Sequence, residues 1–85
     1  MAYEIVYAPS AAEALRKLDR QVARRLLEAI SKLAEEPRSA GGVQLVGGEG
    51  ELRIRVGDYR VVYDVIDEEV VVLILRLGHR REIYR

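Results

Sequence analysis

The fold is decided by residues 51–66 in the second half of the chain, which read ELRIRVGDYRVVYDVI. Apolar and polar side chains alternate on both sides of Gly57-Asp58, and a period of two is typical of β-strands. A glycine in a two-residue connection between such runs is typical of a hairpin turn. The stretch therefore predicts a hairpin with strands at 51–56 and 59–66.

That hairpin fixes which side chains share a face of the sheet. With the turn at 57–58, Val56 lies opposite Tyr59 and Arg55 lies opposite Arg60. Side chains alternate along each strand, so one face is cationic and the other is apolar. The cationic set is Arg53, Arg55 and Arg60, and the apolar set is Leu52, Ile54, Val56, Val61, Tyr63 and Val65. We expect helices to cover the apolar set.

The first residues of the chain predict a strand and a short helix. Residues 3–7 form a β-prone run that ends at Ala8-Pro9. Ser10 precedes Glu13 by three residues, a spacing typical of a capping box, in which both side chains bond backbone amides at a helix start. We therefore expect a helix that starts at Ser10 and ends near Leu18.

A second helix is predicted from Asp19, whose side chain suits an N-cap, to about Glu36. Pro37 ends it, because the residue before a proline avoids helical backbone. Apolar residues recur along it at helical spacing, namely Val22, Leu26, Ile30 and Leu33. Residues 37–50 are rich in glycine and predict a loop, and the glycine spacing there matches no phosphate-binding motif.

The last predicted strand is the continuous apolar run at 69–77, which follows a turn at Asp67-Glu68. Such a run is typical of an interior strand that is covered on both faces, and we expect Gly78 to end it. The predicted order is β-α-α-β-β-β in a single domain, residues 1–85. The fold class is α+β, with a helical hairpin packed on one face of a small, mostly antiparallel sheet.

Composition excludes several classes of site. The 85 residues contain no cysteine and a single histidine, so disulfides, thiolate metal sites and histidine clusters are excluded. We expect neither a metal nor another cofactor. No apolar run approaches the roughly 20 residues of a membrane helix. The first residues also lack the basic start of a signal peptide, so we expect a cytoplasmic protein with no membrane partner.

The charges balance formally, with 14 basic and 14 acidic residues, which by itself disfavours a nucleic-acid binder. Their distribution favours one, because arginines gather in the second half of the chain and acidic residues crowd the predicted helices. Two explanations stay open for the arginines: a general preference for this residue with pairing to surface acids, or a phosphate-binding surface. Arginine presents a planar fork that binds phosphate bidentately.

The C-terminal segment GHRREIYR, residues 78–85, adds titratable side chains directly after the last strand. Rigid strand ends of this kind often carry functional sites. Histidine as a residue type is suited to proton transfer near neutral pH, although a lone exposed histidine such as His79 is more often an ordinary surface residue. Tyr84 has two open roles, since its ring either anchors the chain end or belongs to a site.

Three segments resemble the RelE toxins of the RelE/ParE superfamily of type II toxin–antitoxin systems: GDYRVVY at 57–63, VIDE at 65–68 and GHRREIY at 78–84. The resemblance extends over nearly the whole chain. It implies a ribosome-dependent endonuclease that cuts mRNA in the A site without a metal. In that reaction the 2′-hydroxyl attacks the neighbouring phosphorus. It also implies two kinds of partner, a RelB-like antitoxin and the ribosome with its mRNA.

The resemblance further implies site residues. The scissile phosphate is assigned to Arg60 and Arg80, and the RNA backbone to Arg53, Arg55 and Arg81. Proton transfer is assigned to Tyr84 or His79, where the family pattern favours the tyrosine and the ordinary pKa favours the histidine. One departure is that residues 42–50 carry no lysine or arginine, whereas related toxins are usually basic there.

Two other functions share this fold. One is a ParE-like toxin that inhibits DNA gyrase by binding, and the other is a degenerate, inactive toxin kept for its regulatory complex. The set of arginines with Tyr84 favours the nuclease, because a gyrase binder has no need of it. The balanced net charge is the main support for the degenerate toxin.

Overall fold

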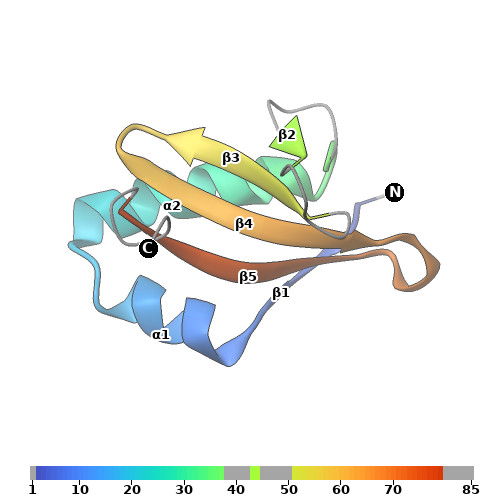
Figure 1. Cartoon of the computed structure of the whole chain (residues 1–85), viewed down its shortest axis with the longest axis horizontal. Coiled ribbons are helices and arrows are strands. Elements are labelled where there is room, and N and C mark those ends of the chain that lie inside the picture. Colours follow the sequence, from blue (N-terminus) through green and yellow to red (C-terminus); the bar gives the residue numbers. More distant parts are fainter. Residues whose placement is uncertain (1, 38–42, 45–50, 80–85) are drawn as a thin grey trace.

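The computed structural model describes residues 2–37, 43–44 and 51–79. In these residues two helices lie against a five-stranded sheet (Figure 1). The elements in chain order are β1 (Glu4–Tyr7), α1 (Pro9–Arg16), α2 (Arg20–Leu33), β2 (Val43–Gln44), β3 (Leu52–Val56), β4 (Tyr59–Ile66), the 3-10 turn η1 (Asp67–Glu69) and β5 (Val71–His79). The predicted α+β fold is confirmed, with β2 as an additional strand inside the predicted loop.

The strand order across the sheet is β1-β5-β4-β3-β2. The strands pair antiparallel except for β1 and β5, which run parallel. The apolar strand β5 therefore lies inside the sheet, as its sequence predicted. Its coverage is uneven, because Val72 and Ile74 are fully buried whereas Leu73 and Leu75 are only half-buried.

The core lies between the two helices and one face of the sheet. In Figure 1, α2 crosses behind β3 and β4, and α1 lies beside β5. The buried residues that form this core are Ala11, Leu26, Ile30, Leu33, Ile54, Val61, Tyr63, Val72, Ile74 and Leu77. The buried Tyr63 hydroxyl donates a hydrogen bond of 2.6 Å to the Pro37 carbonyl, so the segment that follows α2 is tied to the centre of the sheet.

The predicted capping box is wrong. The first helix begins at Pro9, and Ala8 occupies the N-cap without a side-chain hydrogen bond. Proline suits the first helical position, because its fixed φ fits the helix and its missing amide proton is not needed there. Ser10 is consequently inside the helix, where its Oγ donates a long hydrogen bond of 3.5 Å to the Leu75 carbonyl.

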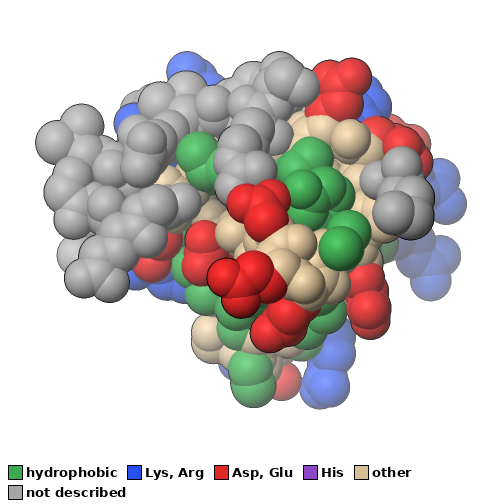
Figure 2. All heavy atoms as spheres, turned by 90° about the vertical axis from the view of Figure 1, so that its right-hand side faces the viewer, with side chains coloured by type: hydrophobic (Ala, Val, Ile, Leu, Met, Phe, Trp, Pro, Cys, Tyr) green, Lys and Arg blue, Asp and Glu red, His purple; other side chains and the backbone are tan. Residues whose placement is uncertain are grey.

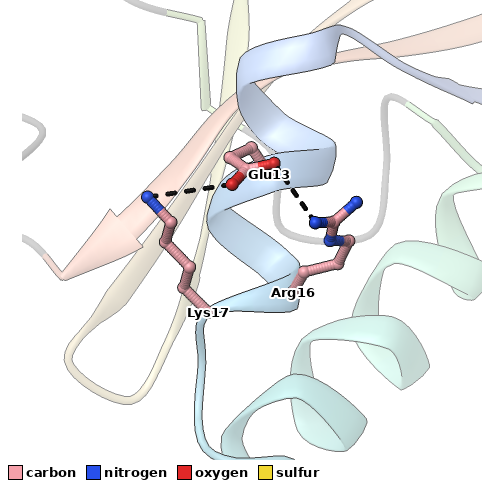
Figure 3. Close-up of polar contacts among 3 residues, drawn as sticks. All are labelled: Glu13, Arg16 and Lys17. Carbon is pink, nitrogen blue, oxygen red and sulfur yellow. Dashed lines mark ion pairs between the residues drawn. The ribbon is translucent and has the colours of Figure 1, made fainter.

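Glu13 pairs with basic residues of its own helix instead of capping it. Figure 3 shows its carboxylate between the guanidinium of Arg16 and the ammonium of Lys17, at 3.6 and 3.8 Å. All three side chains are more than half exposed, so each pair contributes at most a few tenths of a kcal/mol, about 0.3–0.5.

The second helix begins as predicted and ends early. The Asp19 carboxylate accepts the Gln21 amide at 3.1 Å and caps the N-terminus. The helix ends at Leu33, three residues before the predicted end. There the Ala34 carbonyl accepts the Tyr3 amide at 2.7 Å, so this turn bonds to the start of the chain. In the described ranges no helix combines the length and apolar character that crossing a membrane requires.

Candidate nucleic-acid interface

The hairpin register agrees with the prediction. Val56 pairs with Tyr59 and Arg55 with Arg60, and Gly57 takes the positive φ of 62° that a tight turn requires. Arg53, two residues before Arg55, therefore lies on the same face of the sheet. This face is opposite the one that packs on the helices, because Val56 and Tyr59 belong to the core side.

A bulge in β5 adds a fourth arginine to that face. Val62 pairs with Arg76, whereas the next residue, Tyr63, pairs with Ile74, so Leu75 is an extra residue in β5. Strict alternation would have put Arg76 on the same face as buried Ile74. The bulge turns it to the cationic face instead. We call the set Arg53, Arg55, Arg60 and Arg76 the arginine face.

Sequence reasoning missed Arg76, because the bulge is revealed only by which residues of β5 are buried in the structure. Ile74 and Leu77 are both buried in the core and are three residues apart. A regular strand brings residues to the same face at even spacings only, so a spacing of three requires a bulge between them. The half-buried Leu75 is the residue that the bulge inserts.

The arginines of this face have different surroundings. The Arg55 Nε donates to the Gly57 carbonyl at 3.2 Å, which bends the side chain over the turn. Arg76 lies 3.8 Å from the Glu51 carboxylate. Arg53 and Arg60 are half-buried, and the Nη1 atom of Arg60 is buried. An ion pair with a surface acid is thus found for Arg76, with Glu51, whereas such pairing was expected for Arg53, Arg55 and Arg60.

The structure places Gly78 next to Arg60 in the sheet. It is buried in β5 and lies directly opposite Arg60. The prediction that Gly78 ends the strand is wrong, since β5 continues to His79. The glycine therefore adds no side chain to the arginine face at this position.

His79 lies on the opposite face from Arg60. It pairs with Tyr59, and the two ring centroids are 5.5 Å apart with the planes at 79°. Tyr59 packs against the core, so the histidine sits at the end of the helix-covered face. The predicted grouping of His79 with Arg60 is thus not found, because the strand continues through Gly78 and the alternation of side chains continues with it.

The other predicted site residues, Arg80, Arg81 and Tyr84, lie outside the described residues. Within 2–37, 43–44 and 51–79, no three histidine, aspartate or glutamate side chains gather as a candidate metal site.

Opposite charges occupy different parts of the surface. Figure 2 views the molecule from the η1 end, the right-hand side of Figure 1, and shows carboxylates gathered around hydrophobic side chains there. Exposed acidic residues of β1, η1 and the turn after α2 meet at this end, namely Glu4, Glu35, Glu36, Asp67, Glu68 and Glu69. The zero net charge therefore does not describe each part of the surface, because these six of the 14 acidic residues gather at the η1 end, whereas Glu51 lies beside Arg76 of the arginine face.

The helices are less acidic than we predicted from the sequence. The exposed side of α2 carries Arg20, Arg24 and Arg25 against the single acid Glu28. A second set of cations thus lies on the helix side of the sheet, away from the arginine face.

Comparison with known proteins agrees with the fold and the motifs. A family model described as the ParE toxin of the parDE type II toxin–antitoxin system matches residues 5–84. Toxin RelG of Mycobacterium tuberculosis is 34% identical over 100% of this chain and 99% of its own length. The mRNA interferase toxin RelE of Escherichia coli is 33% identical over 99% of this chain and 92% of its own.

Solved structures give the same result. The toxin–antitoxin complex RelBE2 from Mycobacterium tuberculosis contains a chain that superposes with a TM-score of 0.83 at 31% identity, covering 94% of this chain and 93% of that one. The match in sequence and the match in fold both extend over nearly the full length. The chain therefore belongs to the RelE/ParE family of type II toxin–antitoxin toxins.

Proposed function

We propose that this toxin is an endoribonuclease that cuts mRNA on the ribosome, and that the arginine face binds the RNA backbone at the cut. The observation that carries the proposal is the pairing of Arg55 with Arg60 across the hairpin. Like charges directly opposite each other destabilise a sheet, and an anion between them relieves the repulsion. The phosphates of RNA are such anions. The similar toxin of Escherichia coli is named an mRNA interferase.

The reaction is a transesterification within the RNA. The 2′-oxygen forms a bond to the neighbouring phosphorus as the bond from phosphorus to the 5′-oxygen breaks. A base takes the proton of the 2′-hydroxyl, and an acid gives a proton to the leaving 5′-oxygen. Negative charge grows on the phosphoryl oxygens in the transition state, where fixed guanidinium donors are most effective.

Each arginine takes a role that suits its surroundings. We assign Arg60, which is half-buried beside Gly78, to the scissile phosphate together with Arg80. Arg53, Arg55 and Arg81 bind the adjoining backbone. To this set we add Arg76, which Glu51 holds from one side.

Proton transfer is assigned to Tyr84 in preference to His79. The reason is geometric, since the imidazole shares a face with Tyr59 and Arg60 is on the other face. A tyrosine serves as a base near neutral pH only if neighbouring cations lower its pKa, and a cluster of arginines supplies such cations. An arginine itself holds its proton too firmly to act as the base.

The cellular partner that we propose is a RelB-like antitoxin. The similar structure from Mycobacterium tuberculosis is a toxin–antitoxin complex. An antitoxin segment that orders itself on binding, with acidic residues against the arginine face, would exclude RNA from it.

Primer extension on an mRNA, with and without purified ribosomes, tests the proposal. Cuts inside codons that appear only when both the toxin and ribosomes are present are the expected result. A folded, toxic protein that produces no cuts would contradict it. The description of the matching family as a ParE toxin favours gyrase inhibition as the second candidate. Loss of DNA supercoiling by gyrase in the presence of the toxin would then identify that function.

A further inference from the structure

A cavity of about 190 Å³ lies between α2 and the β3–β4 turn. We call it the turn pocket, and it is lined by Val22, Arg25, Leu26, Val56, Gly57, Asp58 and Tyr59. Sites for drug-sized ligands are usually larger, roughly 300–1,000 Å³. The turn pocket therefore suits a single ring system or a single side chain and not a whole cofactor.

The polar groups of the turn pocket are a cation and a carboxylate. Arg25 extends from α2 to the turn, where its Nη2 lies 3.4 Å from the position that a Cβ on Gly57 would occupy. Asp58 is exposed in the turn itself. Among the residues that the structure describes, neither Arg25 nor Asp58 forms a hydrogen bond or an ion pair through its side chain. Donors and acceptors for a ligand are thus both available.

Tyr59 supplies an aromatic ring that is held in place. It is half-buried and packs against the core. The ring of His79 also contacts it edge-on, with 5.5 Å between centroids. A ring that is fixed before the ligand arrives makes a good stacking platform, since little conformational freedom remains to be lost. We therefore treat His79 as a positioning residue for Tyr59.

The turn pocket and the arginine face lie on the two sides of the same turn. Arg55 and Arg60 extend from one side of the hairpin, and Tyr59 extends from the other. The Arg55 guanidinium is also bonded to Gly57, a residue that lines the pocket. Single-stranded RNA that crosses this end of the hairpin can place phosphates on one side of the turn and a base on the other.

We infer that the turn pocket binds one unpaired nucleobase of the RNA whose backbone lies on the arginine face. The base stacks on Tyr59, and Arg25 and Asp58 bond its polar edge. This inference rests on the proposed function. Unpaired bases are commonly bound in this way, by an aromatic stack with hydrogen bonds to the edges. An apolar side chain of a protein partner fits the pocket less well, because it would cover Arg25 and Asp58 without bonding either.

The test uses the intact toxin and a short, unstructured 2′-O-methyl RNA, which has no free 2′-hydroxyl and cannot be cut. In one series 2-aminopurine replaces each base in turn, and in another an abasic nucleotide does so. We expect fluorescence quenching at one position and a loss of affinity of about 5- to 150-fold for the RNA that is abasic there, the range for one base–aromatic stack. The salt dependence should stay unchanged, because it reports phosphate contacts.

Variants assign the effect to the pocket. Tyr59→Leu should remove both the quenching and the preference for an intact base, whereas Tyr59→Phe should keep both. Because Tyr59 packs against the core, unfolding curves must show that the leucine variant is folded. Arg25→Gln, on the exposed surface of α2, is a second variant that should weaken base preference with less risk to the fold.

The outcomes separate this inference from the function on which it rests. If the RNA binds, loses affinity in an Arg53→Gln/Arg55→Gln variant, and tolerates an abasic nucleotide at every position, the inference is wrong and the function stands. If Tyr59→Leu leaves RNA affinity intact and weakens antitoxin binding, the pocket holds a protein side chain and the inference is likewise wrong. Failure to bind RNA at low salt, together with failure to cut mRNA on ribosomes, would overturn both.

Discussion

The two faces of the sheet differ by a single step along each strand. On one face Ile54, Val61 and Tyr63 are buried against the helices, and on the other Arg53, Arg55 and Arg60 form part of the arginine face. Burial of apolar area stabilises the fold by about 25 cal/mol per Å², whereas directly opposed like charges destabilise it. The comparison indicates that the helix-covered face stabilises a fold whose other face carries opposed positive charges. Substitutions should separate these two contributions.

The largest effect on stability is expected from the helix-covered face. Ile30 is 1% exposed, and Ile30→Ala should lower the free energy of unfolding by about 2–5 kcal/mol, because it removes buried methyl groups and leaves a cavity. Ile30→Val is the matched control, with an expected loss of about 0.5–1.5 kcal/mol. Urea unfolding measures both. Cleavage per folded molecule should stay constant, and its loss in a folded variant would show that the faces are not independent.

A substitution on the arginine face should instead lower cleavage and leave stability nearly unchanged. Arg60→Ala should lower the cleavage rate by about 100- to 1,000-fold, since it removes a donor to the charge that grows in the transition state. Its free energy of unfolding should change by less than about 1 kcal/mol. Arg16→Ala, an exposed arginine of α1, is the control and should cut at the wild-type rate. A time course of ribosome-dependent cleavage measures both rates. An Arg60→Ala toxin with full activity would show that this residue is not part of the site.

A substitution of His79 tests whether this residue positions Tyr59 or transfers a proton. If it only positions Tyr59, His79→Gln should lower cleavage far less than Arg60→Ala and should leave the shape of the pH–rate profile unchanged. A profile that loses its rise near the ordinary histidine pKa, about 6.5, would instead show that the imidazole transfers a proton.

Much of the fold was predictable because alternating side chains, a glycine turn and a helix cap act locally. The hairpin register and the cap at Asp19 follow from such signals, and both are found. What failed depends on contacts between distant segments. The turn that follows α2 bonds to the Tyr3 amide, and the strand β2 pairs with β3. Neither partner is visible in the sequence of the element concerned.

The candidate site was also predictable where it depends on local alternation, and not where it depends on the course of β5. The alternation in β3 and β4 brought Arg53, Arg55 and Arg60 to one face, as expected. The bulge at Leu75 added Arg76, and the continuation of β5 through Gly78 placed His79 on the other face. Glycine is permissive and does not by itself end a strand, so its neighbours in the sheet decide whether the strand continues.

A smaller effect is expected at Arg55, where a substitution should improve stability and weaken RNA binding. Arg55→Thr removes one of two opposed charges and introduces a β-prone residue, so the free energy of unfolding should rise by about 0.2–1 kcal/mol. The same change should weaken single-stranded RNA binding and reduce the slope of log affinity against log salt by about 0.7. Arg24→Gln, on α2, is the control and should leave that slope unchanged. A less stable Arg55→Thr variant would show that the bond to Gly57 outweighs the repulsion.

The smallest expected effect is a change of the free energy of unfolding with pH, and it concerns the helix-covered face. Burial raises the pKa of the Tyr7 phenol, on the core side of β1, above its usual 10.0. The fold thus favours the neutral phenol. Its contribution to stability is fully present below the unfolded pKa, about 10, and is lost as the pH rises through the higher folded value.

Tyr7→Phe should therefore lose less stability than the wild type over that alkaline range, and their urea unfolding free energies should converge or cross. Arginine keeps its proton there, so the arginine face retains its charge while the helix-covered face weakens. Parallel stability curves for the two proteins would show that the Tyr7 pKa is the same in the folded and unfolded chains.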